Sequence, residues 1–348
     1  MNAPLPLPPH FDPDTVDSVW RVPYEAVAGS AQAWARQHAV GPAASDIPRI
    51  LLIAVDMQNT FCIPGFELFV AGRDGMGAVG DVRRLCEFIY RNLGSITAIA
   101  PTMDTHEAFQ IFHPVFWVDA GGHHPAPYTS ISTQDVASGR WRVNPAVAAS
   151  LHDDLGWLQR VALHYVTSLE RGGKYELTIW PYHAMLGGIG HALVSSLEEA
   201  AFFHGMVRNT QPVFQVKGDN PLTENYSVLQ PEVLEGPDGA PLAERNVTFM
   251  QELLRYDAVI LAGEAKSHCL AWTIHDLLAH IRAESPRLVE KVYLLEDCSS
   301  PVVIPGVVDY TEQADTAFAD FKAAGMHVVR STQPMTEWPG MPLATAAG

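Results

Sequence analysis

The stretch AVILAGEAKSHCLAWTIHDLLAHIRAE, residues 258–284, contains a short apolar run followed by a helical pattern. The run AVILAG is typical of a strand inside a parallel sheet, where both faces are covered. The apolar residues that follow recur at helical spacing. These residues are Leu270, Ile274, Leu277, Leu278 and Ile281. The segment therefore predicts a buried strand that leads directly into an amphipathic helix.

Apolar runs of the same kind recur along the chain and alternate with helical patterns. The further runs lie at residues 51–56, 95–104, 212–218, 292–297 and 327–331. The further helical patterns lie at residues 79–92, 190–204, 246–255 and 311–324. Because strand–helix alternation builds parallel sheets, the sequence predicts an α/β fold in three layers. We expect a mostly parallel sheet of about six strands with helices on both faces.

Two parts of the chain interrupt this pattern. The N-terminal residues resemble an extended arm, with one helix near residues 24–38. Residues 117–176 are rich in Gly, Pro, His and Trp and favour an insertion, with one helix near residues 145–158. The expected parts are an arm and helix at 1–48, one domain with its insertion at 49–331, and a tail at 332–348.

Composition and charge narrow the classes of function. Of 348 residues, 47% are hydrophobic and 18% charged, which is typical of a globular protein. The net charge of −17 argues against a nucleic-acid partner, because phosphate binding needs clustered Lys and Arg. No apolar run is long enough for a membrane span, and the N-terminus lacks the pattern of a signal peptide. The four widely spaced cysteines suit reduced thiols, so we expect a cytoplasmic protein.

Cys269 lies in the first turn of the helix that follows the strand at residues 258–263. The positive end of the helix dipole favours a thiolate at this position. The N–H groups of a first helical turn are also available to an oxyanion. Cys269 is therefore a candidate nucleophile, although this segment alone fits a buried core cysteine equally well.

Two charged residues, Asp56 and Lys217, end predicted strands. The carboxyl ends of parallel strands meet at one edge of a sheet, where ligands bind. Buried charges there need partners. Together with Cys269, they would supply a general base, a cation that lowers the pKa of the thiol, and a nucleophile. The alternative is that Asp56 and Lys217 only form an ion pair.

A second group of polar residues belongs to the same edge. Asp104 and His106 form an Asp-x-His sequence at the end of the strand at residues 95–104, and His183 follows the insertion. One carboxylate and two or three imidazoles suit a divalent metal ion, with zinc favoured and iron or manganese as alternatives. His113 is a candidate for a further ligand. The alternative is a hydrogen-bonded Asp–His pair without a metal.

Five segments of the chain carry a recognisable signature. They are VDMQNTFC (55–62), MDTH (103–106), WPYHAMLGG (180–188), KGDNPLTENYS (217–227) and GEAKSHCL (263–270). In this order they resemble the signature segments of the isochorismatase-like cysteine hydrolases, and among these the nicotinamidases most. The resemblance covers residues 50–116 and 177–331.

This resemblance implies a catalytic triad of Asp56, Lys217 and Cys269. It implies a metal site of Asp104, His106 and His183, and aromatic residues Phe61 and Trp180 on either side of a pyridine ring. It also implies a cis peptide between Glu264 and Ala265, which would direct the N–H groups of Ala265 and Cys269 at the oxyanion. The reaction expected is hydrolysis of a small heteroaromatic amide through a thioester, by a homo-oligomer.

Two positions depart from the nicotinamidase pattern: Ala184 stands where Cys is common, and Glu264 where an apolar residue is usual. Together with the insertion, these differences bear on the substrate more than on the mechanism. A metal-free hydrolase of a vinyl ether, carbamoyl or ureido group is one alternative. A binding protein without catalytic activity is another.

Overall fold

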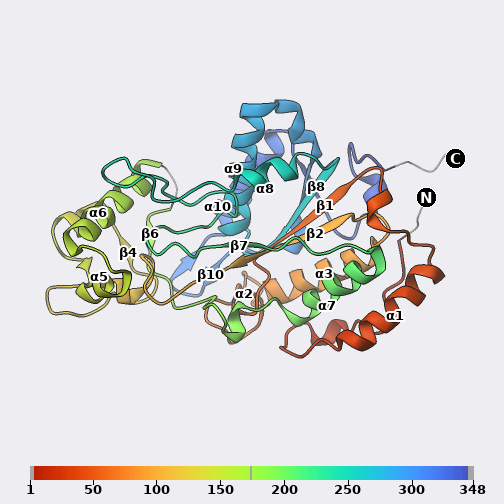
Figure 1. The fold of residues 1–348 in the computed structure, drawn as a ribbon, viewed down its shortest axis with the longest axis horizontal. Helices are drawn as coiled ribbons and strands as arrows, with labels where there is room; N and C mark the ends of the chain where they lie inside the picture. The colour runs from red at the N-terminus through yellow and green to blue at the C-terminus, as the bar shows by residue number, and fades with distance from the viewer. Residues whose placement is uncertain (1–3, 173–174, 344–348) are drawn as a thin grey trace.

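A computed structural model describes residues 4–172 and 175–343 of the chain. Its centre is a six-stranded sheet in which every neighbouring pair of strands is parallel, in the order β12-β9-β8-β1-β2-β7 (Figure 1). All six predicted strands are therefore present. They are β1 (Ile50–Val55), β2 (Ala98–Asp104), β7 (Gln215–Lys217), β8 (Ala258–Gly263), β9 (Val292–Leu295) and β12 (His327–Val329).

Helices cover both faces of this sheet (Figure 1). One face carries α3 (Gly77–Arg91) and α7 (Ser195–Arg208). The other carries α8 (Val247–Leu253), α9 (Cys269–Glu284) and α10 (Thr311–Ala323). The residues of β1 alternate between the two interiors, so that Leu52 packs with one core and Ile53 with the other. Burial of both faces explains why β1 is apolar at each position. The predicted three-layer α/β architecture is confirmed.

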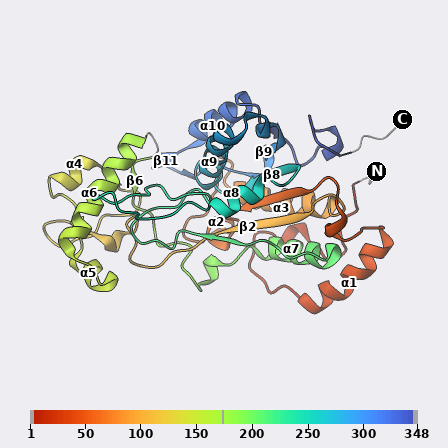
Figure 2. The same ribbon diagram turned by 45° about the horizontal axis from the view of Figure 1, so that its top comes forward.

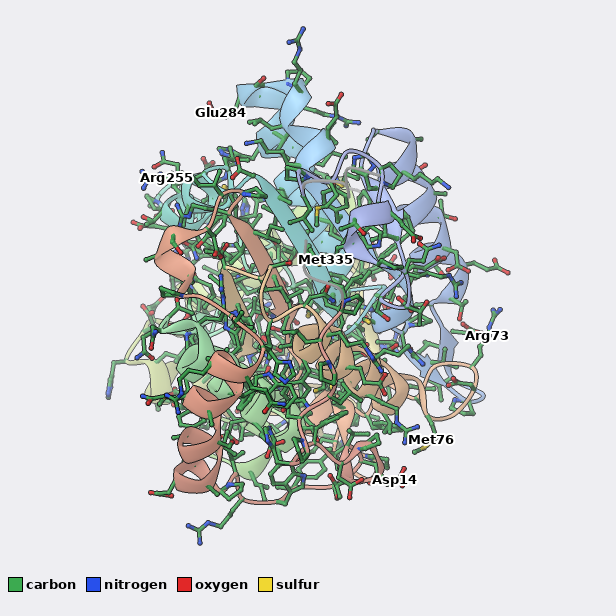
Figure 3. The ribbon with its side chains drawn as sticks, turned by 90° about the vertical axis from the view of Figure 1, so that its right-hand side faces the viewer. Asp14, Arg73, Met76, Arg255, Glu284 and Met335 are labelled. Atoms are coloured by element: carbon green, nitrogen blue, oxygen red, sulfur yellow. The ribbon has the colours of Figure 1, made fainter. Side chains whose placement is uncertain are left out.

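The N-terminal arm folds back along the domain. Its helix α1 (Tyr24–Gln37) lies beside α7, at the end of the molecule away from the insertion (Figures 1 and 2). The backbone of Trp20 and the hydroxyl of Ser195 exchange hydrogen bonds of 2.9 and 2.8 Å. Figure 3 shows the side chains of Asp14, in the arm, and Glu284, at the end of α9, on opposite sides of the sheet.

The insertion forms a helical lobe at the other end of the molecule (Figure 2). The prediction of one helix near residues 145–158 was wrong, because His152 adopts a left-handed conformation with φ 55° and ends the first of two helices. The lobe contains α4 (Thr133–Ala137), α5 (Pro145–Leu151) and α6 (Leu155–Gly172). Two short antiparallel pairs connect it: β3 (Trp117–Val118) with β5 (Arg142–Val143), and β4 (Ser130–Ile131) with β6 (Leu177–Thr178).

Further short elements include α2 (Asn59–Cys62) and the hairpin of β10 (Val303–Ile304) and β11 (Val308–Asp309). Beyond β12, Trp338 is buried and stacks on Phe88 of α3. Within residues 4–172 and 175–343, no helix is long and apolar enough to cross a membrane.

Candidate active site

The carboxyl ends of β1, β7 and β8 bring three predicted residues together. Asp56 directly follows β1, Lys217 is the last residue of β7, and Cys269 begins α9 after β8. The Nζ of Lys217 lies 2.9 Å from Oδ2 of Asp56 and 3.7 Å from Sγ of Cys269. A carboxylate, an ammonium group and a thiol are therefore in mutual reach, although the three residues lie far apart in the sequence.

Asp56 is fully buried and held by a neighbour on β2. The hydroxyl of Thr102 donates a short hydrogen bond to Oδ1 of Asp56. The same hydroxyl accepts a 3.0 Å hydrogen bond from the backbone N–H of Asp56. Burial raises the pKa of Asp56, and the positive charge of Lys217 opposes this effect. Thr102 was not assigned a role from the sequence. A hydroxyl within an otherwise apolar strand, two residues before Asp104, was the signal for it.

The charge of Lys217 is well supported by its surroundings. Burial alone would lower its pKa, but the carboxylates of Asp104 and Asp56 outweigh burial and raise that pKa well above its ordinary value. Its Nζ also donates a 2.9 Å hydrogen bond to the carbonyl of Asn225. Lys217 is therefore a fixed cation beside the thiol.

The surroundings of Cys269 oppose the effect of the helix dipole, which favours a thiolate. Burial raises its pKa well above the ordinary value, and Lys217 compensates for only part of that effect. Asp56 and Asp104 raise the pKa further, and Asp56 also forms a hydrogen bond with the thiol. Together these effects favour the protonated thiol, with Asp56 as its hydrogen-bond partner.

The turn before Cys269 contains a cis peptide bond between Glu264 and Ala265. The N–H groups of His268 and Leu270 both donate to the carbonyl of Ala265. In the described part of the chain, the N–H groups of Ala265 and Cys269 have no such partner, so they are free to bind an oxyanion.

The side chain of Glu264 is buried beside Asp81 of α3 rather than exposed at the strand edge. Burial, followed by the charge of Asp81, raises the pKa of Glu264 well above its ordinary value. Ser300 bridges the two acids, because its N–H donates to Glu264 at 3.3 Å and its hydroxyl to Asp81 at 2.5 Å. Glu264 directly precedes Ala265, and the Ser300 carbonyl accepts from the N–H of Lys266 at 2.8 Å, so this network contacts the turn that contains Ala265.

Asp104, His106 and His183 form a compact cluster of candidate metal ligands. Their ligand atoms all lie within 4.8 Å of one another. Nε2 of His106 and of His183 lie 2.8 and 3.6 Å from Oδ2 of Asp104. The Nδ1 atoms face the carbonyls of Gly218 and Pro181 at 3.0 and 2.7 Å. Both imidazoles are thus oriented by a backbone carbonyl, as is common for metal-ligating histidines, and the donor set fits a divalent ion.

His113 lies against this cluster. Its ring centroid is 5.8 Å from that of His106 and 5.9 Å from that of His183. Its Nδ1 faces the carbonyl of Ala108 at 3.2 Å, while its buried Nε2 has no partner among the described residues. Burial lowers the pKa of His113 to about 3, so the ring is neutral and able to bind a metal.

Gln58 fixes the position of Asp104 and was not identified from the sequence. Its side-chain amide donates to the Asp104 carbonyl and accepts from the Asp104 N–H, both at 2.8 Å. Such a pair of bonds holds β2 against the segment after β1. The signal for it was its place two residues after Asp56.

A narrow cavity of about 30 Å3 is lined both by the thiol and by two members of the cluster. Phe61 and Trp180, predicted to contact a ring, both line it. Glu224, Tyr226 and His268 also line it, and no role was predicted for them from the sequence. The other lining residues are Leu68, Val70, Asp104, His183, Ala265, Cys269 and Val302. The apolar wall and the few polar groups are typical of a site for a small ligand.

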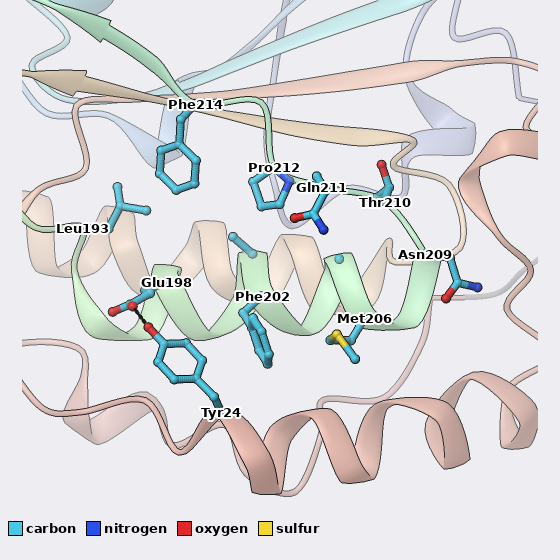
Figure 4. Close-up of a pocket in the computed structure, with 12 residues that line it drawn as sticks. Tyr24, Leu193, Glu198, Phe202, Met206, Asn209, Thr210, Gln211, Pro212 and Phe214 are labelled. Carbon is cyan, nitrogen blue, oxygen red and sulfur yellow. Dashed lines mark hydrogen bonds between the residues drawn. The ribbon is translucent and has the colours of Figure 1, made fainter.

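A second hollow lies between α1, α7 and the segment that precedes β7 (Figure 4). It shares no residue with the cavity at Cys269. Figure 4 shows Tyr24 bonded to Glu198, with Phe202, Met206 and Phe214 along its wall. Its lining contains no cysteine, histidine or lysine, and therefore none of Cys269, Lys217, His106 and His183.

No protein-family model matches the sequence, and no curated protein matches it. Among solved structures, it resembles a yeast nicotinamidase bound to the inhibitor nicotinaldehyde, with 18% identity, a TM-score of 0.50, and coverage of 81% of this chain and 99% of that one. An Acinetobacter baumanii nicotinamidase gives 18% identity, a TM-score of 0.48, and coverage of 82% and 97%. A Pyrococcus horikoshii pyrazinamidase in complex with zinc has 18% sequence identity and a TM-score of 0.45, and the match covers 81% of this chain and 99% of that one.

At these identities the likeness concerns the fold. The yeast structure is matched over almost its whole length, so the predicted isochorismatase-like fold of the nicotinamidases is confirmed.

Proposed function

Starting from this nicotinamidase-like fold, we propose that the chain is an amide hydrolase that converts a small heteroaromatic amide to its carboxylic acid and ammonia. The observation that carries the proposal is the position of Lys217, which contacts both Asp56 and Cys269. A base and a cation in reach of a thiol that lines a cavity are the groups that nucleophilic amide hydrolysis requires.

The first half of the reaction forms a thioester. Asp56 accepts the thiol proton of Cys269, and Lys217 stabilises the resulting thiolate. The sulfur attacks the amide carbonyl, and the N–H groups of Ala265 and Cys269 donate to the oxyanion. Asp56 then returns the proton to the leaving nitrogen, and ammonia departs.

The second half of the reaction releases the acid. A water molecule takes the place of ammonia and loses a proton to Asp56 as it attacks the thioester. The carbon–sulfur bond breaks, the proton returns to the sulfur, and Cys269 is restored as a thiol. The high pKa of Cys269 favours this last protonation.

Asp104, His106 and His183 would hold a divalent metal ion, with zinc the best fit to this donor set and iron or manganese as alternatives. When bound, the ion would supply a Lewis acid that orients a ring nitrogen of the substrate. Phe61 and Trp180 would then contact the two faces of the ring and exclude water from it.

Ammonia release from nicotinamide, pyrazinamide and larger aryl and alkyl amides tests this function. We expect release from at least one heteroaromatic amide and its loss, by at least about a thousandfold, in Cys269→Ala. Cys86→Ala, which removes a buried cysteine of α3 outside the cavity, is the matched control. Turnover retained by Cys269→Ala, or no release from any amide, would contradict the proposal.

A further inference from the structure

Glu224 is a buried acid in the wall of the cavity that contains Cys269. Its side chain belongs to the loop between β7 and α8, and only 4% of the residue is exposed. Oε1 accepts a long, 3.4 Å hydrogen bond from the N–H of Asn225. Oε2 has no hydrogen-bond partner among residues 4–172 and 175–343. A buried carboxyl oxygen without a hydrogen-bond partner destabilises the folded chain unless a ligand supplies the donor.

The backbone of Glu224 is anchored by several hydrogen bonds. Its N–H donates to the hydroxyl of Tyr165 at 3.1 Å, and Tyr165 belongs to α6 of the insertion. Its carbonyl accepts from the N–H of Glu232 at 2.9 Å and from the hydroxyl of Thr223 at 3.2 Å. The insertion therefore helps to hold this carboxyl group in the cavity wall, which makes Glu224 a preorganised binding group.

Glu224 lines the same cavity as Asp104 and His183, two members of the metal-ligand cluster. Its carboxyl group interacts electrostatically with His106 and Asp104. Burial raises the pKa of Glu224 to about 8. A carboxyl group in either protonation state offers an oxygen to a hydrogen-bond donor.

We propose that Glu224 determines the substrate class by accepting a hydrogen bond from an amino group on the ring carbon next to the ring nitrogen. The inference rests on the proposed function, in which that nitrogen faces the cluster of Asp104, His106 and His183. A substrate with an apolar group at this carbon leaves the carboxyl oxygen unpaired. Sites built to bind a polar group reject analogues without it more strongly than they reject a change in size.

The test compares 6-aminonicotinamide with 6-methylnicotinamide, because an amino and a methyl group are similar in size and only the amino group donates. We expect kcat/KM to be at least about tenfold higher for the amino compound. Glu224→Leu should remove this preference, and Glu224→Gln, which keeps an acceptor, should retain part of it. Glu235→Gln, an exposed acid of the same loop, is the control.

Binding gives a second measurement that does not depend on turnover. Calorimetry on Cys269→Ala, with and without Glu224→Leu, should show at least about tenfold tighter binding of the amino compound only when Glu224 is present. Equal kcat/KM and equal Kd for the two compounds in the native cavity would overturn the role of Glu224 while amide hydrolysis stands. A preference that persists in Glu224→Leu would also overturn it. If no amide releases ammonia, the proposed function fails, and the two Kd values alone decide on Glu224.

Discussion

Lys217 and Asp104 form a buried ion pair, with Nζ 2.8 Å from Oδ1. The second oxygen of Asp104 faces His106 at 2.8 Å. One carboxylate therefore connects the group around Cys269 to the cluster of candidate metal ligands. We expect a substitution in the group around Cys269 to affect the metal-ligand cluster through Asp104, and the reverse. Variants in either group should therefore be measured both for thiol reactivity and for metal content.

Lys217→Gln should make Cys269 less reactive. Because the charge of Lys217 lowers the pKa of the thiol, its removal raises that pKa further. A rise of one unit slows alkylation by iodoacetamide at pH 8 about tenfold, and we expect at least this effect. Turnover should fall by at least about a hundredfold. Lys291→Gln, in which the lost contact is a 3.2 Å hydrogen bond to the Tyr256 carbonyl, is the control. Unchanged alkylation in Lys217→Gln would show that the ammonium group does not act on the thiol.

The pH dependence of kcat/KM should report Asp56. Asp56 accepts a proton only when it is ionised, and burial raises its pKa from 3.8. Activity should therefore be lost on the acid side with a midpoint above 3.8. Thr102 donates to the ionised carboxylate and lowers this pKa, so Thr102→Val should move the midpoint up by about one unit.

Thr97→Val is the matched control for that shift. Thr97 immediately precedes β2, and its hydroxyl donates a hydrogen bond to Asp46 at the amino end of the sheet. Its replacement should leave the midpoint where it is. An acid midpoint that does not respond to Thr102→Val would mean that another group controls the acid limb.

Metal content should depend on His113 as well as on the three closest ligands. Its Nε2 has no partner among the described residues, and its ring centroid lies 5.8 and 5.9 Å from those of His106 and His183. We expect His113→Ala to weaken zinc binding about 10- to 100-fold, measured as metal per chain after dialysis against graded chelator. His123→Ala, an exposed histidine of the insertion, should bind as the native chain does. Equal zinc affinity in His113→Ala would limit the ligands from this chain to Asp104, His106 and His183.

The strands and the three central residues could be predicted from the sequence because each depends on local pattern. A run such as LLIAVD is apolar at every position except the last, and parallel strands bring their carboxyl ends to one edge. The sequence alone could therefore predict that Asp56, Lys217 and Cys269 lie close together. The break at His152 could not be predicted, because a left-handed residue other than glycine leaves little trace in the sequence.

The protonation of Cys269 and the role of Glu224 depend on tertiary contacts. The dipole of α9 and the charge of Lys217 both favour a thiolate, and both were visible in the sequence. The burial that outweighs them is created by elements distant in the chain. The backbone N–H of Glu224 donates to the hydroxyl of Tyr165, which belongs to the insertion. No pattern in the sequence indicates this contact.

Glu264→Gln should stabilise the protein increasingly as the pH rises. The pKa of Glu264 in the folded chain lies well above its ordinary value of 4.5, because burial and Asp81 disfavour its charge. The folded state therefore holds this proton more tightly than the unfolded state. The resulting stabilisation is present below about pH 4.5 and is lost as the pH rises towards the folded-state pKa.

A glutamine keeps the shape of the side chain and can still accept from the N–H of Ser300, but it does not titrate. Above about pH 5, the free energy of unfolding of Glu264→Gln, relative to the native chain, should rise by about 1 kcal/mol per pH unit until the folded-state pKa of Glu264 is passed. Urea unfolding at each pH measures this difference. Glu284→Gln, at the exposed end of α9, is the control (Figure 3). A difference that does not change with pH would show that Glu264 releases its proton as easily in the folded chain as in the unfolded one.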